Sequence, residues 1–230
     1  MWKSLLLVVV VACGGGAAHK PPIDNTTPVP AANADAYTLA VVMSGWEVWI
    51  GNDKLAELAP EDPSRARGVL LDLAAAFDKL DLAHTAPAGS MAMVVTFADK
   101  AAIRLPLSPI ASFNGAVLGT QKDYYGTAGT ELVRGVTLAL DQIAKAPTKR
   151  KYLLVLSDGN DTNNQEAAKE LPKLKAQAAQ DGIVIYALTY RTVLSPAGNM
   201  APMLTDNAKV VPTSDAIAAD LAHIFERLGK

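Results

Sequence analysis

The chain has 230 residues, 50% of them hydrophobic, and a formal net charge of −2 from 21 basic and 23 acidic residues. It is too apolar for a disordered chain and too charged for a protein with several membrane spans, so we expect a globular protein. The balanced charge does not indicate the basic surface of a nucleic-acid-binding protein, and we expect no nucleic acid as a partner. A single cysteine, Cys13, excludes an intrachain disulfide.

Residues 1–12 have the layout of a secretory signal peptide. Lys3 supplies a positive charge, residues 4–12 form an apolar run, and the glycines after Cys13 are small. The apolar run is shorter than the about 20 residues that cross a bilayer. The sequence therefore predicts export rather than a membrane-spanning helix.

The end of this run, Val10-Val11-Ala12-Cys13, resembles a bacterial lipobox. The resemblance implies that Cys13 is lipidated and becomes the first residue of the mature chain. The alternative is an ordinary signal peptide with an incidental cysteine. A diacylglycerol on the thiol carries two acyl chains, which anchor a protein stably where one chain does not. We expect an extracytoplasmic protein at the cell envelope, and Gly14 favours the outer membrane if the bacterium is Gram-negative.

Residues 13–36 are predicted to be the lipidated cysteine and a flexible tether. Small residues follow Cys13, and the prolines at positions 21, 22, 28 and 30 break any helix. As a flexible coil this segment would span roughly 25 Å. We expect the domain to lie near the membrane without resting on it.

From residue 37 onward the pattern alternates between strand and helix. Residues 37–43 read as a buried strand, and Asp62-Pro63 has the residue types of a helix start. Residues 90–97 form a second buried strand, and residues 101–107 form a shorter one. Pro106 places this last strand at an edge of the sheet, because proline cannot donate a hydrogen bond to a neighbouring strand.

The second half continues the alternation. Thr130 opens a helix, Ser214 caps the last one, and Gly182 fits the exit of a helix over residues 164–180. Pro172 predicts a break inside that helix. The remaining strands are predicted at residues 151–156, 183–189 and 209–212.

Apolar strands joined by helices predict a three-layer α/β/α domain, doubly wound around a mainly parallel sheet with one antiparallel edge strand. One domain over residues 37–230 accounts for the whole pattern. Ligands of such sheets bind at the carboxyl ends of the strands. Ser44 and Asp158 lie just past such ends and Thr130 begins a helix, so these three oxygen-bearing residues mark a candidate site.

The order of these pieces resembles a von Willebrand factor type A domain over nearly all of residues 37–230. The resemblance rests on Ser44-Gly45 after the first strand, Gly129-Thr130 at a helix start, and Leu156-Ser157-Asp158-Gly159 after a later strand. Residues 93–99 match the usual second strand of the family. The resemblance implies a domain that binds other proteins.

The family's metal-ion-dependent adhesion site has the pattern Asp-x-Ser-x-Ser, a later threonine and a later aspartate. Carried over to this chain, Val42 and Trp46 replace the first aspartate and the second serine, whereas Ser44, Thr130 and Asp158 match. In the intact family site, an acidic residue of the partner protein completes the coordination of the ion.

The two replacements change the chemistry of the site. Mg²⁺ is held by near-octahedral oxygen atoms, usually with one or two carboxylates, and Asp158 is the only carboxylate left from the pattern. We therefore expect no cofactor. The alternative is Mg²⁺ or another divalent cation held by substitute ligands, for which Glu47, Asp123 and Asp161 are candidates.

Structural roles offer a second interpretation of the three matching residues. Ser44 can satisfy backbone groups in a turn, Thr130 can act only as a helix cap, and Asp158 with Gly159 can act only as a turn. The low number of metal ligands favours these structural roles.

Four aromatic residues flank the candidate site in sequence: Trp46, Trp49, Tyr124 and Tyr125. The fold would bring their two loops to the same edge, and tryptophan and tyrosine are enriched at binding hot spots. These residues are therefore candidates for partner contact. The alternative is that the rings pack on one another and fill the position of the lost ion.

The chain lacks the motifs of common enzyme classes, including Gly-x-Ser-x-Gly, a Walker loop and His-Glu-x-x-His. We expect no enzymatic activity. The sequence predicts a lipid-anchored, extracytoplasmic module that binds an unidentified protein without a bridging metal ion. The alternatives are a metal-dependent adhesion domain with substituted ligands and a passive scaffold subunit of an envelope complex.

Overall fold

A computed structural model describes residues 33–44, 69–115, 129–190, 198–211 and 216–228. These residues contain a six-stranded sheet with the order β3-β2-β1-β4-β5-β6. All neighbouring strands run parallel except β3, which is antiparallel to β2. The predicted mainly parallel sheet with an antiparallel edge strand is confirmed. The strands are β1 (Tyr37–Ser44), β2 (Met91–Phe97), β3 (Ala101–Pro109), β4 (Arg150–Ser157), β5 (Ile183–Tyr190) and β6 (Ala208–Val211).

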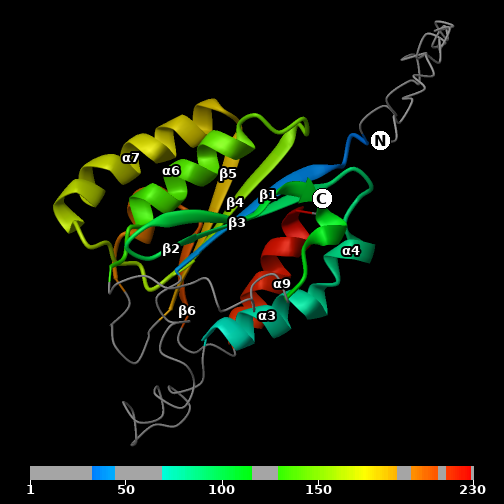
Figure 1. Ribbon diagram of the computed structural model, residues 1–230, viewed down its shortest axis with the longest axis horizontal. Coiled ribbons are helices and arrows are strands. Elements are labelled where there is room, and N and C mark those ends of the chain that lie inside the picture. Colours follow the sequence, from blue (N-terminus) through cyan, green and yellow to red (C-terminus); the bar gives the residue numbers. More distant parts are fainter. Residues whose placement is uncertain (1–32, 45–68, 116–128, 191–197, 212–215, 229–230) are drawn as a thin grey trace, which may run out of the picture. The chain divides into compact units, whose positions relative to one another are not determined.

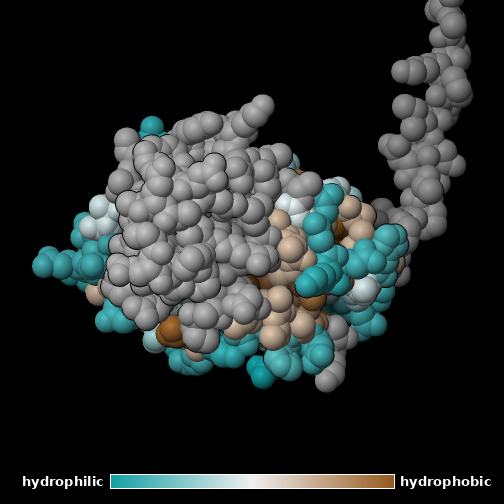
Figure 2. Space-filling model, turned by 90° about the horizontal axis from the view of Figure 1, so that it is seen from below, coloured by the Kyte–Doolittle hydropathy of each residue, from teal (hydrophilic) through white to brown (hydrophobic). Residues whose placement is uncertain are grey.

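Helices cover both faces of the sheet (Figure 1). One face carries α6 (Leu132–Ile143) and α7 (Asn164–Gln180), and the other carries α3 (Val69–Leu80) and α9 (Ala216–Leu228). In the view from below, hydrophilic residues border a hydrophobic area on its right side (Figure 2). Within the described ranges no helix is long and apolar enough to cross a membrane. The sequence did not predict the short elements α4 (Leu82–Thr85), η2 (Ile110–Ser112) and α8 (Ala201–Leu204).

The central strand β1 is buried on both faces, which explains its mostly apolar sequence. All eight of its residues are buried, and it pairs with β2 on one side and β4 on the other. Successive side chains point to opposite faces, so Val41 and Met43 join the core under α3 and α9. Ala40 and Val42 join the core under α6 and α7. Because both faces of this strand are covered, its sequence does not alternate between apolar and polar residues.

The helix α7 corrects one prediction. It runs from Asn164 to Gln180 without the break expected at Pro172. Pro172 is exposed, while its neighbours Leu171 and Leu174 are buried against the sheet. The backbone hydrogen bond that proline removes therefore lies on the solvent side, and the buried leucines keep the helix continuous. Gly182 follows in the left-handed region with φ 66°, which confirms it as the helix exit.

A single arginine connects the start and the end of the described domain. The Arg150 Nη2 donates to the carbonyl oxygen of Leu228 at 2.5 Å, and its Nη1 lies 3.4 Å from the carbonyl oxygen of Asp35. Its Nε donates to the Tyr152 hydroxyl at 3.1 Å. Burial raises the pKa of the neighbouring Tyr37 to about 12. The residues just before β1 and at the end of α9 thus meet at the edge of the sheet where the parallel strands begin.

Two predicted helix starts, Asp62-Pro63 and Ser214, lie outside the described residues. The same holds for residues 1–32, which include Cys13 and most of the tether. These predictions remain expectations.

Gly135 allows α6 to pack closely on β2, and its replacement by alanine tests this packing. A Cβ atom at Gly135 would lie 2.7 Å from the Cδ1 of the buried Phe97. In an ordinary helix the change stabilises by about 1 kcal/mol, but here we expect destabilisation by about 1–3 kcal/mol from overpacking. Urea unfolding measures the difference, with the exposed Asp141→Ala in the same helix as the control. A Gly135→Ala protein as stable as the wild type would contradict this packing.

Candidate functional site

The predicted site lies at the carboxyl edge, which we define as the edge of the sheet where the parallel strands end. Met43 of β1 pairs with Leu156 of β4, so Ser44 lies level with Ser157, one residue before Asp158. Ser44 is 3% exposed and Asp158 is 8% exposed. The structure therefore brings the ends of these two strands together, as the sequence predicts.

The Asp158 carboxylate is occupied by its own loop. It accepts hydrogen bonds from the Asn160 backbone N–H at 3.1 Å and from the Asn160 Nδ2 at 2.9 Å. The Ser157 Oγ accepts from the Gly159 N–H at 2.8 Å, and Gly159 has a positive φ of 76°. These contacts are those of a turn, the structural role considered for Asp158 and Gly159.

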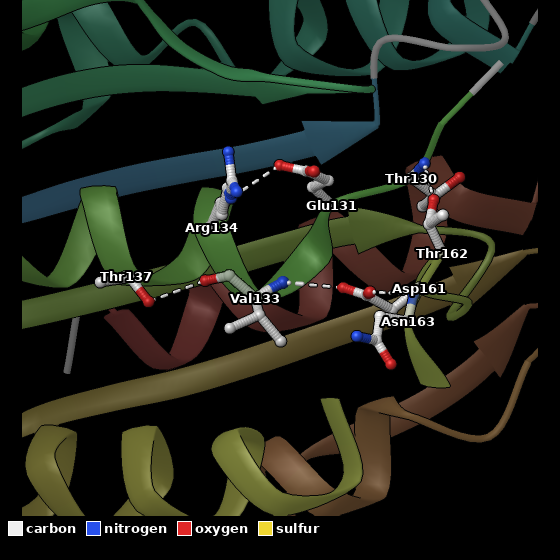
Figure 3. Close-up of polar contacts among 8 residues, drawn as sticks. All are labelled: Thr130, Glu131, Val133, Arg134, Thr137, Asp161, Thr162 and Asn163. Atoms are coloured by element: carbon white, nitrogen blue, oxygen red, sulfur yellow. Dashed lines mark hydrogen bonds and ion pairs between the residues drawn. The ribbon is translucent and has the colours of Figure 1, made fainter. Parts of the chain in front are cut away.

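Thr130 is held by a reciprocal pair of hydrogen bonds (Figure 3). Its N–H donates to the Thr162 Oγ1 at 2.7 Å, and the Thr162 N–H donates to its carbonyl oxygen at 2.7 Å. The next residue, Glu131, donates its N–H to the carbonyl oxygen of Ala98 at 2.7 Å. The segment before α6 therefore lies between the loop after β2 and the loop after β4.

The prediction that Thr130 caps α6 is wrong. The helix begins at Leu132, and the residue before it, Glu131, makes no side-chain cap hydrogen bond. The Asp161 Oδ2 from the loop after β4 instead accepts from the Val133 N–H at 3.1 Å (Figure 3). A carboxylate at a helix N-terminus also interacts favourably with the helix dipole. The backbone of Thr130 forms hydrogen bonds with Thr162. The first turn of α6 is capped by Asp161, which lies 28 residues from Val133 in the sequence.

The other flank of residues 158–163, which we name the Asp158 loop, contacts the segment before α8. The Gly198 N–H donates to the carbonyl oxygen of Asp158 at 2.6 Å, and the Met200 N–H donates to that of Gly159 at 3.1 Å. A Cβ atom at Gly198 would lie 2.2 Å from the Gly159 oxygen. Only glycine allows this close approach of the two backbones. Together with the bonds between Thr162 and Thr130, these contacts hold the Asp158 loop on both of its flanks.

A hollow of about 220 Å³ lies beside the Asp158 loop, and Glu131 and Arg134 are among the residues that line it. The Arg134 Nε lies 2.9 Å from the Glu131 Oε2, and the two side chains form an ion pair (Figure 3). A larger hollow of about 490 Å³ between β5, β6 and α9 contains none of the predicted site residues. The smaller hollow is lined by Glu131, Val133, Arg134, Asp161, Thr162, Asn163, Glu166 and Ala167.

The described residues do not fit a hard divalent cation. Val42 stands where the family pattern has an aspartate, and it is fully buried in the apolar core under α6 and α7. The Asp158 carboxylate is occupied by Asn160. Among the described residues no group of three or more His, Cys, Asp or Glu side chains could hold an ion. The described residues of this edge therefore do not bring together the oxygen ligands that such an ion needs.

Several predicted residues lie outside the part of the chain that the structure describes. They are Cys13, Trp46, Glu47, Trp49, Asp123, Tyr124 and Tyr125.

The sequence interpretation missed two residues at the carboxyl edge. Thr162 contacts Thr130, and Asp99 packs against Gly129, where a Cβ atom would lie 3.0 Å from the Asp99 Cα. The position of Asp99 just after β2 was a signal, because polar residues after parallel strands meet at one edge. Thr162 gave no such signal.

No family model and no curated protein matches the sequence. Solved structures do match. The BatB protein of Bacteroides thetaiotaomicron is 12% identical with a TM-score of 0.58, and the match covers 84% of this chain and 98% of that one. The vWF domain of the type V pili tip protein Mfa5 from Porphyromonas gingivalis is 11% identical with a TM-score of 0.59, over 84% and 95% of the chains.

A von Willebrand factor type A structure from Catenulispora acidiphila is 13% identical with a TM-score of 0.59, over 84% of this chain and 43% of that one. At such identities the likeness concerns the fold and not the activity. The sheet order and the position of the antiparallel strand agree with it. The described part of this chain has the von Willebrand factor type A fold.

Proposed function

We propose that this chain is a protein-binding module of the cell envelope that recognises its partner at the carboxyl edge without a bridging metal ion. The observation that carries the proposal is the hydrogen-bonded state of that edge. The Asp158 carboxylate is engaged by Asn160, and the loop that contains it is fixed to neighbouring segments by direct hydrogen bonds. The described part of the edge is thus held together before any ligand arrives, and such preorganisation lowers the cost of binding.

The fold supports a binding role over a catalytic one. The neighbours include a type V pili tip protein and an aerotolerance-related membrane protein, both named as surface or membrane proteins. Loops beside the ligand edge of such a sheet are where function concentrates. We therefore place the partner contact on residues 44–50 and 121–130, and we propose no enzymatic activity.

Alanine substitutions at Trp49 and Tyr124 test the proposed contact. We expect each to reduce capture of the native partner at least about tenfold, because aromatic anchors contribute about 2 kcal/mol or more at such surfaces. Crosslinking in the native envelope measures the capture. Val184→Ala is the control, since Val184 is 40% exposed near the start of β5, at the end of the strand opposite to the carboxyl edge. Unchanged capture by correctly folded variants would favour the passive scaffold instead.

A second candidate function is a metal-dependent adhesion domain. It is favoured by one neighbour, proximal thread matrix protein 1 from the mussel byssus, whose structure has a zinc-occupied MIDAS motif. That protein is 18% identical with a TM-score of 0.57, and this chain covers 46% of it.

Calorimetry on the intact protein in detergent separates the two candidates. We expect no saturable heat on titration with Mg²⁺, Mn²⁺, Ca²⁺ or Zn²⁺, because one occupied carboxylate does not hold a hard cation. The control is the same titration of Asp158→Ala. Micromolar binding by the wild type that Asp158→Ala abolishes, with the fold intact, would establish the metal-dependent candidate.

The lipid anchor at Cys13 makes a separate prediction. Cys13→Ser removes the thiol that would carry the diacylglycerol, so we expect the protein to leave the membrane fraction or to retain its signal peptide. Fractionation and intact-mass measurement test this. A Cys13→Ser protein that is processed and remains in the membrane fraction would contradict the anchor.

A further inference from the structure

We propose that Thr162 and Asp161 are positioning residues of the carboxyl edge, which fix Thr130 and the start of α6 by direct hydrogen bonds without a bridging ion. The inference rests on the proposed metal-independent function. It names residues outside the five positions of the adhesion-site pattern.

The first connection joins Thr162 to Thr130. Two hydrogen bonds of 2.7 Å link them, one from the Thr130 N–H to the Thr162 side chain and one between the two backbones. The residues lie 32 positions apart in sequence, so the contact links two separate segments. The backbone of Thr130 is therefore held on both its N–H and its carbonyl side.

The second connection joins Asp161 to α6. Its Oδ2 accepts from the Val133 N–H at 3.1 Å, and its Oδ1 accepts from the Asn163 N–H at 2.8 Å. One carboxylate thus binds the first turn of α6 and its own loop at once (Figure 3). Because Val133 is one of the N-terminal residues of the helix, its N–H has no partner inside the helix, and Asp161 supplies one.

Thr162 and Asp161 are themselves held in place by the contacts of the Asp158 loop. The opposite flank of the Asp158 loop accepts hydrogen bonds from Gly198 at 2.6 Å and from Met200 at 3.1 Å. The Asn163 Oδ1 caps α7 by accepting from the Glu166 N–H at 3.2 Å. The loop is therefore attached to the segment before α8, to α7 and to α6, so it can hold Thr130 in one position.

Amide hydrogen exchange of the intact protein tests the inference without a partner. Thr162→Val removes the Oγ1 acceptor and keeps the size of the side chain. We expect exchange of the Thr130 amide to accelerate about tenfold, because one net hydrogen bond changes a local opening equilibrium by about that factor. Thr137→Val is the matched control, since the Thr137 Oγ1 donates only to the Val133 carbonyl within α6 at 2.8 Å. The control should leave the Thr130 amide unchanged.

A second variant and a metal arm sharpen the test. Asp161→Ala should accelerate exchange of the Val133 amide by a similar factor. In the wild type, protection of both amides should be equal in EDTA and in excess Mg²⁺. Protection that requires Mg²⁺, or a Thr130 amide whose exchange rate is the same in Thr162→Val as in the wild type, would overturn the inference.

The outcome is independent of the partner experiment. If both amides are protected in EDTA while Trp49→Ala and Tyr124→Ala keep full partner capture, the positioning role stands and the proposed recognition surface fails. If partner capture is lost in those variants while the amides are protected only with Mg²⁺, the recognition surface stands and the positioning role fails.

Discussion

The arrangement of the carboxyl edge depends on the hydrogen bonds that hold the Asp158 loop between two other segments. On one flank Thr162 binds Thr130, and on the other Gly198 donates to the carbonyl oxygen of Asp158. Both contacts join segments far apart in sequence, and both lie at the ends of buried parallel strands. The apolar sheet places these segments side by side, and the hydrogen bonds then determine how the loops lie on its edge.

In the described part of this edge, protein groups bond one another directly. A bridging cation needs several oxygen ligands, and clustered carboxylates repel one another when the ion leaves. Here Val42 contributes apolar packing to the core under α6 and α7, and the Asp158 carboxylate accepts two hydrogen bonds from Asn160. Val42, at the position where the family pattern has an aspartate, is thus part of the core that supports the edge.

Most of the fold was predictable from the sequence, because its elements follow local patterns. The apolar run of β1, the edge position of β3 with Pro106 and the exit of α7 at Gly182 are readable from residue types alone. The continuity of α7 through Pro172 was not, because it depends on which side of the helix faces the core. The cap of α6 was missed for a similar reason. It comes from Asp161, and no local pattern around Thr130 indicates a donor or acceptor supplied by another loop.

The central claim is that direct hydrogen bonds, and no bridging ion, fix the carboxyl edge. A crystal structure of the intact protein grown with excess Mn²⁺, with anomalous scattering recorded, tests it most directly. The account predicts a hydrogen bond between the Thr130 N–H and the Thr162 Oγ1, an Asp158 carboxylate bound to Asn160, and no anomalous peak beside Ser44. A Mn²⁺ peak coordinated by Ser44 and Thr130, with Asp158 turned toward it, would contradict the account.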